Sequence, residues 1–229
     1  MKKASYIAIL TAACVTLPLI ADDLPITAEE QKDLTPDEVL EDLMEGNERY
    51  VAGEIAEPNI KARIEAASTG QYPQAVILSC LDSRVPVEDI FDQGIGDIFV
   101  GRVAGNIENV DQLGSMEFAA GAAGVKLVMV LGHEACGAVK GACDDVKLGN
   151  LTDLLAKIKP AIDSVEGHDG ARTSENTEFV NAVIEANVRQ TVADIRERSE
   201  VLAGMEEEGK IKIVGAIYSL QDGSVSLLD

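Results

Sequence analysis

The chain has 229 residues, of which 46% are hydrophobic and 26% charged, a composition typical of one globular domain with an ample core. Its formal net charge is −21. Nucleic acids and anionic membrane surfaces are bound by clustered Lys and Arg, so this acidity argues against both as partners.

The first 21 residues have the features of a secretory signal peptide. Two lysines precede an uncharged apolar stretch over residues 4–20, and Ala21 stands before an acidic segment. A membrane span needs ~20 apolar residues, and this stretch is shorter and interrupted by a proline. We therefore expect cleavage near Ala21, export to the periplasm or the medium, no stable membrane anchor, and a single mature domain over residues 22–229. Cys14 raises a lipoprotein alternative, but Thr11 stands where a lipobox needs an aliphatic residue.

An N-terminal helical arm is predicted ahead of the first strand. Thr35 is suited to cap a helix, and Pro36 is suited to its first turn. Apolar residues then recur at helical spacing, namely Val39, Leu40, Leu43 and Met44.

The first predicted strand begins at Ala75, is mostly apolar and ends at Cys80. Asp82 and Arg84 follow at alternate positions, which on a regular strand would point them to the same side. The next predicted elements are a short helix over residues 86–92, a strand over 97–100 and a helix over 109–121.

A second apolar strand is predicted over residues 125–131, and it stops at a glycine. His133 therefore lies at the carboxyl end of a parallel strand, and Cys136 follows where a helix begins. Ligands of open α/β sheets bind at this edge.

The rest of the chain alternates helices and strands. Helices are predicted over residues 150–164 and 175–200, and the second has one apolar side formed by Phe179, Val183, Ile184, Val188, Val192 and Ile195. Two last strands over 210–218 and 224–228 are joined by Gln-Asp-Gly, and His168 lies in a glycine-flanked loop as a surface residue. The order predicts an α/β fold with a central, mostly parallel sheet flanked by helices.

Cys80, His133 and Cys136 together indicate a metal site. Three thiolate and imidazole ligands that leave a fourth position free are typical of catalytic zinc. A lone His-x-x-Cys pair is more often ordinary structure, but a second strand that ends in Cys-x-Asp-x-Arg has no packing explanation. Cys143, two helical turns further on, is expected to be a buried helix cysteine without a role.

These motifs resemble those of the β-class carbonic anhydrases over about residues 40 to 229. The likeness rests on Cys80-Leu-Asp82-Ser-Arg84 and on Gly132-His133-Glu-Ala-Cys136-Gly137. It extends through residues 46–51, 96–100, 102–106 and 217–223. The resemblance implies one zinc ion per chain, held by Cys80, His133 and Cys136, and reversible hydration of CO2 to bicarbonate and a proton by zinc-bound hydroxide.

The resemblance also implies roles for other residues. Asp82 would orient the hydroxide, or in some family members swing onto zinc and close the site, while Arg84 keeps Asp82 ionised. Gln71 would reach the substrate of a second subunit, so the chain is expected to form a homodimer or a tetramer. The remaining positions would form an apolar substrate wall, namely Phe99, Ala104, Phe118 and Gly137.

Three positions depart from common family patterns. Val103 replaces the usual Asn, Phe118 stands where plant-type relatives carry Tyr, and Ile77 stands where the bicarbonate-regulated subgroup has Trp. The last departure favours a constitutively open site. Two alternatives stay open: a zinc hydrolase of the same fold for carbon disulfide or carbonyl sulfide, and a noncatalytic zinc-stabilised relative whose Val103 marks lost activity. A structural zinc site would need none of Asp82, Arg84 and Gln71, which argues against the noncatalytic alternative.

Overall fold

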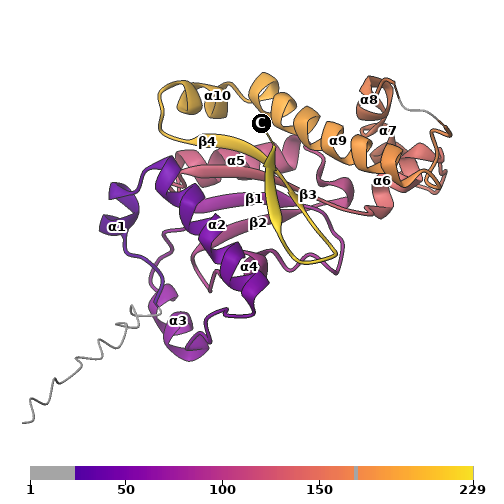
Figure 1. Cartoon of the computed structure of the whole chain (residues 1–229). Helices are drawn as coiled ribbons and strands as arrows, with labels where there is room; N and C mark the ends of the chain where they lie inside the picture. Colours follow the sequence, from indigo (N-terminus) through magenta and orange to yellow (C-terminus); the bar gives the residue numbers. More distant parts are fainter. Residues whose placement is uncertain (1–23, 168–169, 229) are drawn as a thin grey trace, which may run out of the picture.

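The computed structural model describes residues 24–167 and 170–228, so the predicted signal peptide and His168 lie outside the described residues. Its centre is a five-stranded sheet with helices on both faces (Figure 1). The strands are β1 (Ala75–Ser79), β2 (Ile98–Arg102), β3 (Leu127–His133), β4 (Lys212–Tyr218) and β5 (Val225–Leu228). They lie in the order β2-β1-β3-β4-β5, and only the β4–β5 pair is antiparallel. The predicted α/β class with a mostly parallel sheet is confirmed.

Helices cover both faces of the sheet, which explains why β1 and β3 are apolar throughout. On one face α2 (Pro36–Ala52) and α4 (Val87–Ile90) pack over Ile77 and Met129. On the other face α5 (Val110–Gly121), α9 (Thr177–Arg198) and α10 (Glu200–Glu207) pack over Leu78 and Val130. Alternate residues of each strand therefore enter different cores.

A third apolar cluster lies at the carboxyl edge of the sheet. Its helical elements are η1 (Ala104–Asn106), α6 (Gly137–Cys143), α7 (Leu151–Ala156), α8 (Lys159–Ser164) and the first half of α9. Cys80 and Cys136 belong to this cluster, together with Ile158 and Phe179. The two cysteines are thus enclosed by side chains from distant parts of the sequence.

The N-terminal arm consists of α1 (Ala28–Asp33), α2 and α3 (Ile60–Ala67). The predicted cap at Thr35 is present, because its hydroxyl accepts from the Glu38 amide while the Glu38 carboxylate accepts from Thr35. Helix α2 packs on the sheet of its own chain, whereas α3 leaves Ile60 and Ile64 about half exposed.

Three predictions about the helical segments need correction. Residues 150–164 form two helices, because Pro160 has no N–H to donate to the Ala156 carbonyl and its ring crowds that carbonyl. The helix predicted over 175–200 ends at Arg198, and Ser199 caps α10, whose Leu202 amide donates to the Ser199 hydroxyl. Cys143 ends α6 but is only half-buried.

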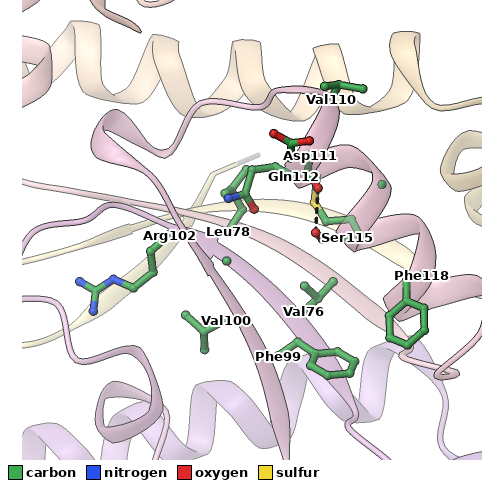
Figure 2. Close-up of a pocket in the computed structure, with 13 residues that line it drawn as sticks. Val76, Leu78, Phe99, Val100, Arg102, Val110, Asp111, Gln112, Ser115 and Phe118 are labelled. Carbon is green, nitrogen blue, oxygen red and sulfur yellow. Dashed lines mark hydrogen bonds between the residues drawn. The ribbon is translucent and has the colours of Figure 1, made fainter. Parts of the chain in front are cut away.

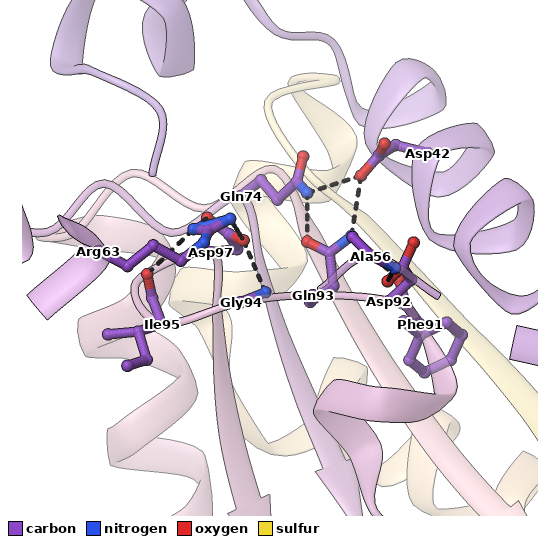
Figure 3. A network of polar contacts seen from close by, with 10 residues as sticks. All are labelled: Asp42, Ala56, Arg63, Gln74, Phe91, Asp92, Gln93, Gly94, Ile95 and Asp97. Carbon is purple, nitrogen blue, oxygen red and sulfur yellow. Dashed lines mark hydrogen bonds and ion pairs between the residues drawn. The ribbon is translucent and has the colours of Figure 1, made fainter. Parts of the chain in front are cut away.

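The amino edge of the sheet carries a polar network (Figure 3). Arg63 donates to both carboxylate oxygens of Asp97, at 3.2 and 2.8 Å, and the Gly94 amide donates to the same group. Gln74 donates to Asp42 and to Gln93, both at 2.8 Å. The network ties the arm and the β1–β2 connection to the start of the sheet.

None of the helices in the described part of the chain combines the length and the apolar character that crossing a membrane requires.

Candidate metal centre

Three buried side chains meet at the carboxyl edge of the sheet. Cys80 directly follows β1, His133 is the last residue of β3, and Cys136 directly precedes α6. Their exposed fractions are 4%, 0% and 1%, and their ligand atoms all lie within 4.8 Å of one another. The two Sγ atoms are 3.9 Å apart. This matches the separation of about 3.8 Å expected for two thiolates on tetrahedral zinc, so the predicted ligands are brought together.

A tight turn between His133 and Cys136 lets both side chains enter one cluster. Ala135 has a φ of 52°, in the left-handed region that L-residues seldom adopt. The turn is held from both sides, because the Glu134 amide donates to the Tyr218 carbonyl and the Glu134 carboxylate accepts from the Leu220 amide. The β4–β5 connection therefore supports the conformation of the ligand turn.

His133 is oriented by its own backbone neighbour. Its Nδ1 lies 2.8 Å from the Glu134 carbonyl oxygen, which can only accept, so Nδ1 carries the proton and Nε2 presents a lone pair in the neutral ring. Within the described part of the chain, Nε2 is buried with no hydrogen-bond partner. Leaving such an atom unpaired costs about 1–3 kcal/mol, a cost that coordination to a metal ion removes.

The two thiols share one negative charge readily. Contact with Cys136 lowers the pKa of Cys80, and contact with Cys80 together with burial raises the pKa of Cys136. Cys80 also accepts a hydrogen bond from the Gly105 amide, at 3.3 Å. A second thiolate at 3.9 Å from the first requires a cation between them, which is the chemistry that a divalent metal ion supplies.

Asp82 lies beside the cluster and forms a bidentate ion pair with Arg84. The Arg84 Nε and Nη2 atoms donate to the two Asp82 oxygens, at 2.8 and 2.7 Å, and hold the pKa of this carboxyl well below its usual range. Asp82 Oδ2 is 3.8 Å from His133 Nε2. The pair follows β1, which ends at Ser79, and a turn brings the two side chains together, with the Arg84 amide donating to Asp82 Oδ1.

Arg102 fixes the loop that carries the first ligand. Its Nε donates to the Cys80 carbonyl at 2.8 Å and its Nη2 to the Asp82 carbonyl at 2.5 Å. The sequence placed Arg102 in a family motif but gave it no role. Val103, which stands where the family usually has Asn, packs against the apolar clusters.

The residues predicted to line the substrate pocket lie in two separate parts of the structure. Ala104 lies in η1, which packs on α6, and Gly137 begins α6 with open space beside its Cα. Phe99 and Phe118 instead face one another, with ring centroids 6.3 Å apart, in a groove of about 770 Å³ between β2 and α5 (Figure 2). Among the described residues that line this groove, the three ligand residues do not appear.

Gln71 lies at the edge of the sheet opposite the metal cluster. It precedes β1, whereas Cys80 follows that strand, so the two residues stand at opposite edges of the sheet. Five strand residues at about 3.3 Å each separate these edges by about 17 Å. Gln71 therefore does not reach the metal cluster of its own chain.

The fold and the cluster define an α/β protein with a Cys-His-Cys site that could hold a metal ion. Residues 75–225 match the family described as carbonic anhydrase. The carbonic anhydrase 2 of Mycobacterium tuberculosis (strain CDC 1551 / Oshkosh) is 38% identical over 193 residues, which cover 82% of this chain and 90% of that protein.

Solved structures give the same result. The β-carbonic anhydrase CcaA superimposes with a TM-score of 0.66 at 25% identity and covers 83% of this chain and 87% of its own. A tetrameric β-carbonic anhydrase from Sordaria macrospora shares the fold with a TM-score of 0.64 at 23% identity, over 83% of this chain and 97% of its own. The chain belongs to the β-carbonic anhydrase family, enzymes whose general reaction is the hydration of carbon dioxide.

Proposed function

We propose that this chain catalyses the reversible hydration of CO2 to bicarbonate and a proton with one zinc ion held by Cys80, His133 and Cys136. The observation that carries the proposal is the buried, unpartnered Nε2 of His133 in one cluster with two thiols. Zinc bound there would lower the pKa of a coordinated water from about 16 towards ~7 and so supply hydroxide near neutral pH.

Asp82 and Arg84 are proposed to act on the proton and the orientation of that water. Because the pKa of Asp82 lies below its usual range, the carboxylate stays an acceptor at neutral pH and can take a hydrogen bond from the attacking oxygen. Both carboxylate oxygens already accept from Arg84, which supports an arrangement in which Asp82 is held off the metal. Ile77 in place of the Trp of the bicarbonate-regulated subgroup agrees with this open form.

CO2 is small and nonpolar, so its binding requires apolar surface near the metal and few polar contacts. Ala104 and Gly137 are proposed to supply this surface from η1 and α6. The proposed polar contact comes from Gln71 of the partner subunit, since the chain's own Gln71 stands at the other edge of the sheet.

A homodimer built through β2 would place these parts together. Strand β2 is at the end of the strand order, and Val110 and Phe118 beside it are 73% and 56% exposed. A two-fold axis perpendicular to the sheet would pair the two β2 strands antiparallel. The amino edge of one subunit would then lie beside the carboxyl edge of the other, and the second copy would cover the groove of Figure 2.

Export is proposed on the sequence of the first 21 residues, with zinc ligation protecting two buried thiols in an oxidising compartment. N-terminal sequencing of the chain from fractionated source cells should find Asp22 as the first residue, in the periplasm or the medium. Finding the full-length chain in the cytosol would refute export but would leave the proposed zinc chemistry unaffected.

The direct test is stopped-flow CO2 hydration by residues 22–229 together with metal analysis. We expect about one zinc per chain. We also expect CO2 hydration that is lost when a chelator removes the zinc. Zinc-loaded protein that hydrates CO2 only at the background rate but hydrolyses carbon disulfide or carbonyl sulfide would favour the alternative hydrolase. Zinc-loaded protein inert towards all three substrates would favour a noncatalytic role.

A further inference from the structure

A buried asparagine on α9 contacts the loop that surrounds the first thiol. The side chain of Asn187 is 2% exposed, and its Nδ2 donates to the Gly105 carbonyl oxygen at 2.8 Å. The two residues are 82 positions apart in the sequence. The contact therefore connects α9 to η1 through a specific hydrogen bond.

The peptide unit on the other side of Gly105 faces the metal cluster. The Gly105 amide donates to Cys80 Sγ at 3.3 Å. Gly105 has a φ of 75°, in the left-handed region that favours glycine, and a Cβ there would lie 2.8 Å from Cδ1 of Ile158. A glycine has no side chain to hold this orientation, and the bond from Asn187 supplies the restraint.

We propose that Asn187 is a positioning residue that acts through Gly105 to keep an amide donor on the Cys80 sulfur. The inference rests on the proposed zinc function. An N–H that donates to a thiolate withdraws charge from the sulfur and fixes its direction, and partners of this kind tune both the retention of a metal ion and its electronic properties.

The two sulfurs depend on different supports. Cys136 directly precedes α6, and the backbone amides of Val139 and Ala138 in that helix donate towards it. Cys80 follows a strand; the Asp82 amide of its own loop lies beside its sulfur, and the Gly105 amide donates to the sulfur from the η1 loop, which α9 contacts through Asn187. Removal of Asn187 should therefore disturb one of the two metal–sulfur contacts and leave the other intact.

The test compares Asn187→Leu with Asn47→Leu. Asn47 is the control, because it is 4% exposed and its Nδ2 donates to the Ile90 and Gly223 carbonyls at 3.1 and 2.9 Å, neither of which belongs to a loop that donates to a ligand sulfur. Two properties would be measured in the mature protein: the transfer of zinc to a competing chelator, and the sulfur-to-metal charge-transfer absorption of the cobalt(II)-substituted form. Circular dichroism and thermal unfolding would report on folding.

We expect Asn187→Leu to weaken zinc binding by about 10-fold to 100-fold. Its cobalt charge-transfer band should move to lower energy, because a sulfur that has lost the Gly105 donor gives up charge more easily. Asn47→Leu should lower the unfolding temperature while both metal properties stay as in the wild type. Asn187→Ala, which removes the donor without adding apolar bulk, provides the same test if the leucine variant does not fold.

The inference is refuted if both folded Asn187 variants keep wild-type zinc binding and an unshifted cobalt band. It is equally refuted if Asn47→Leu shifts the band as far as Asn187→Leu does. A wild-type chain that takes up neither metal would instead overturn the proposed zinc function, so the two failures can be told apart.

Discussion

The two edges of the sheet differ in whether their buried polar side chains have hydrogen-bond partners. At the amino edge, the carboxylate of Asp97 is surrounded by donors from Arg63 and Gly94, and Gln74 bridges two further side chains (Figure 3). At the carboxyl edge, partners are missing. The buried side-chain nitrogen and oxygen atoms without a partner, within the described residues, are Ser79 Oγ, Asn106 Nδ2 and His133 Nε2, and all three belong to this edge.

This difference separates structural polar groups from functional ones. A buried network in which the members satisfy one another holds elements together and gains nothing from a ligand. The unpaired nitrogen of His133 beside two thiols is satisfied only when something else enters the cluster. The structure does not explain the unpaired atoms of Ser79 and Asn106.

Removal of a ligand should have the largest effect. Cys136→Ser should reduce zinc from about one equivalent per chain to a small fraction and abolish CO2 hydration, because the hydroxyl of serine stays protonated and binds zinc poorly. Cys143→Ser, at the other end of the helix that Cys136 precedes, is the matched control, and it should keep both zinc and turnover. Metal analysis and stopped-flow assays check the pair. Equal zinc loss in the two variants would show that the ligand set is wrong.

A comparison of two Arg–Asp pairs, one at each edge, should give the next largest effect. Arg84→Ala should lower turnover by about 100-fold while zinc stays bound, since the ligands remain and only the orientation and protonation of Asp82 change. Arg63→Ala should leave the turnover of the folded enzyme unchanged but cost about 3 kcal/mol of unfolding free energy, because it leaves Asp97 nearly buried without its cation.

Chemical denaturation and CO2 hydration at saturating zinc separate the two outcomes. If Arg84→Ala keeps full turnover, the Asp82–Arg84 pair is merely structural. If Arg63→Ala lowers turnover as much as Arg84→Ala does, the ion pair at the amino edge is not purely structural and the proposed difference between the edges is wrong.

Much of the carboxyl edge could be predicted from the sequence, because the signals are local. Apolar runs that end at Cys80 and His133 mark buried parallel strands, and the carboxyl ends of adjacent parallel strands lie at one edge. The N-cap at Thr35 and the apolar side of α9 are likewise encoded within a few residues. These features need no knowledge of distant contacts.

The rest depends on contacts between distant residues. The break between α7 and α8 is a local effect of Pro160, but the bond from Asn187 to Gly105 spans 82 positions and has no sequence signature. The same applies to Arg102, whose donors reach two backbone carbonyls. Phe99 and Phe118 were placed by resemblance, and the groove they share is a feature of the tertiary packing of β2 against α5.

The smallest effect is expected for Gln71, the residue of the amino edge that is proposed to contact the substrate. Gln71→Ala should lower turnover by about 10-fold, the size expected for one hydrogen bond to the substrate, with zinc content and stability unchanged.

Co-expression of the Gln71→Ala chain with the Cys136→Ser chain then decides which subunit provides the contact. In a mixed dimer, the Gln71→Ala chain has intact ligands and would receive Gln71 of the partner subunit, so one complete site is rebuilt from two defective chains. Differently tagged chains would allow the mixed dimer to be purified and assayed. Activity per intact zinc site near that of the wild type is expected; activity no higher than that of Gln71→Ala alone would mean that the glutamine does not cross between subunits, and that the edges of the sheet work independently.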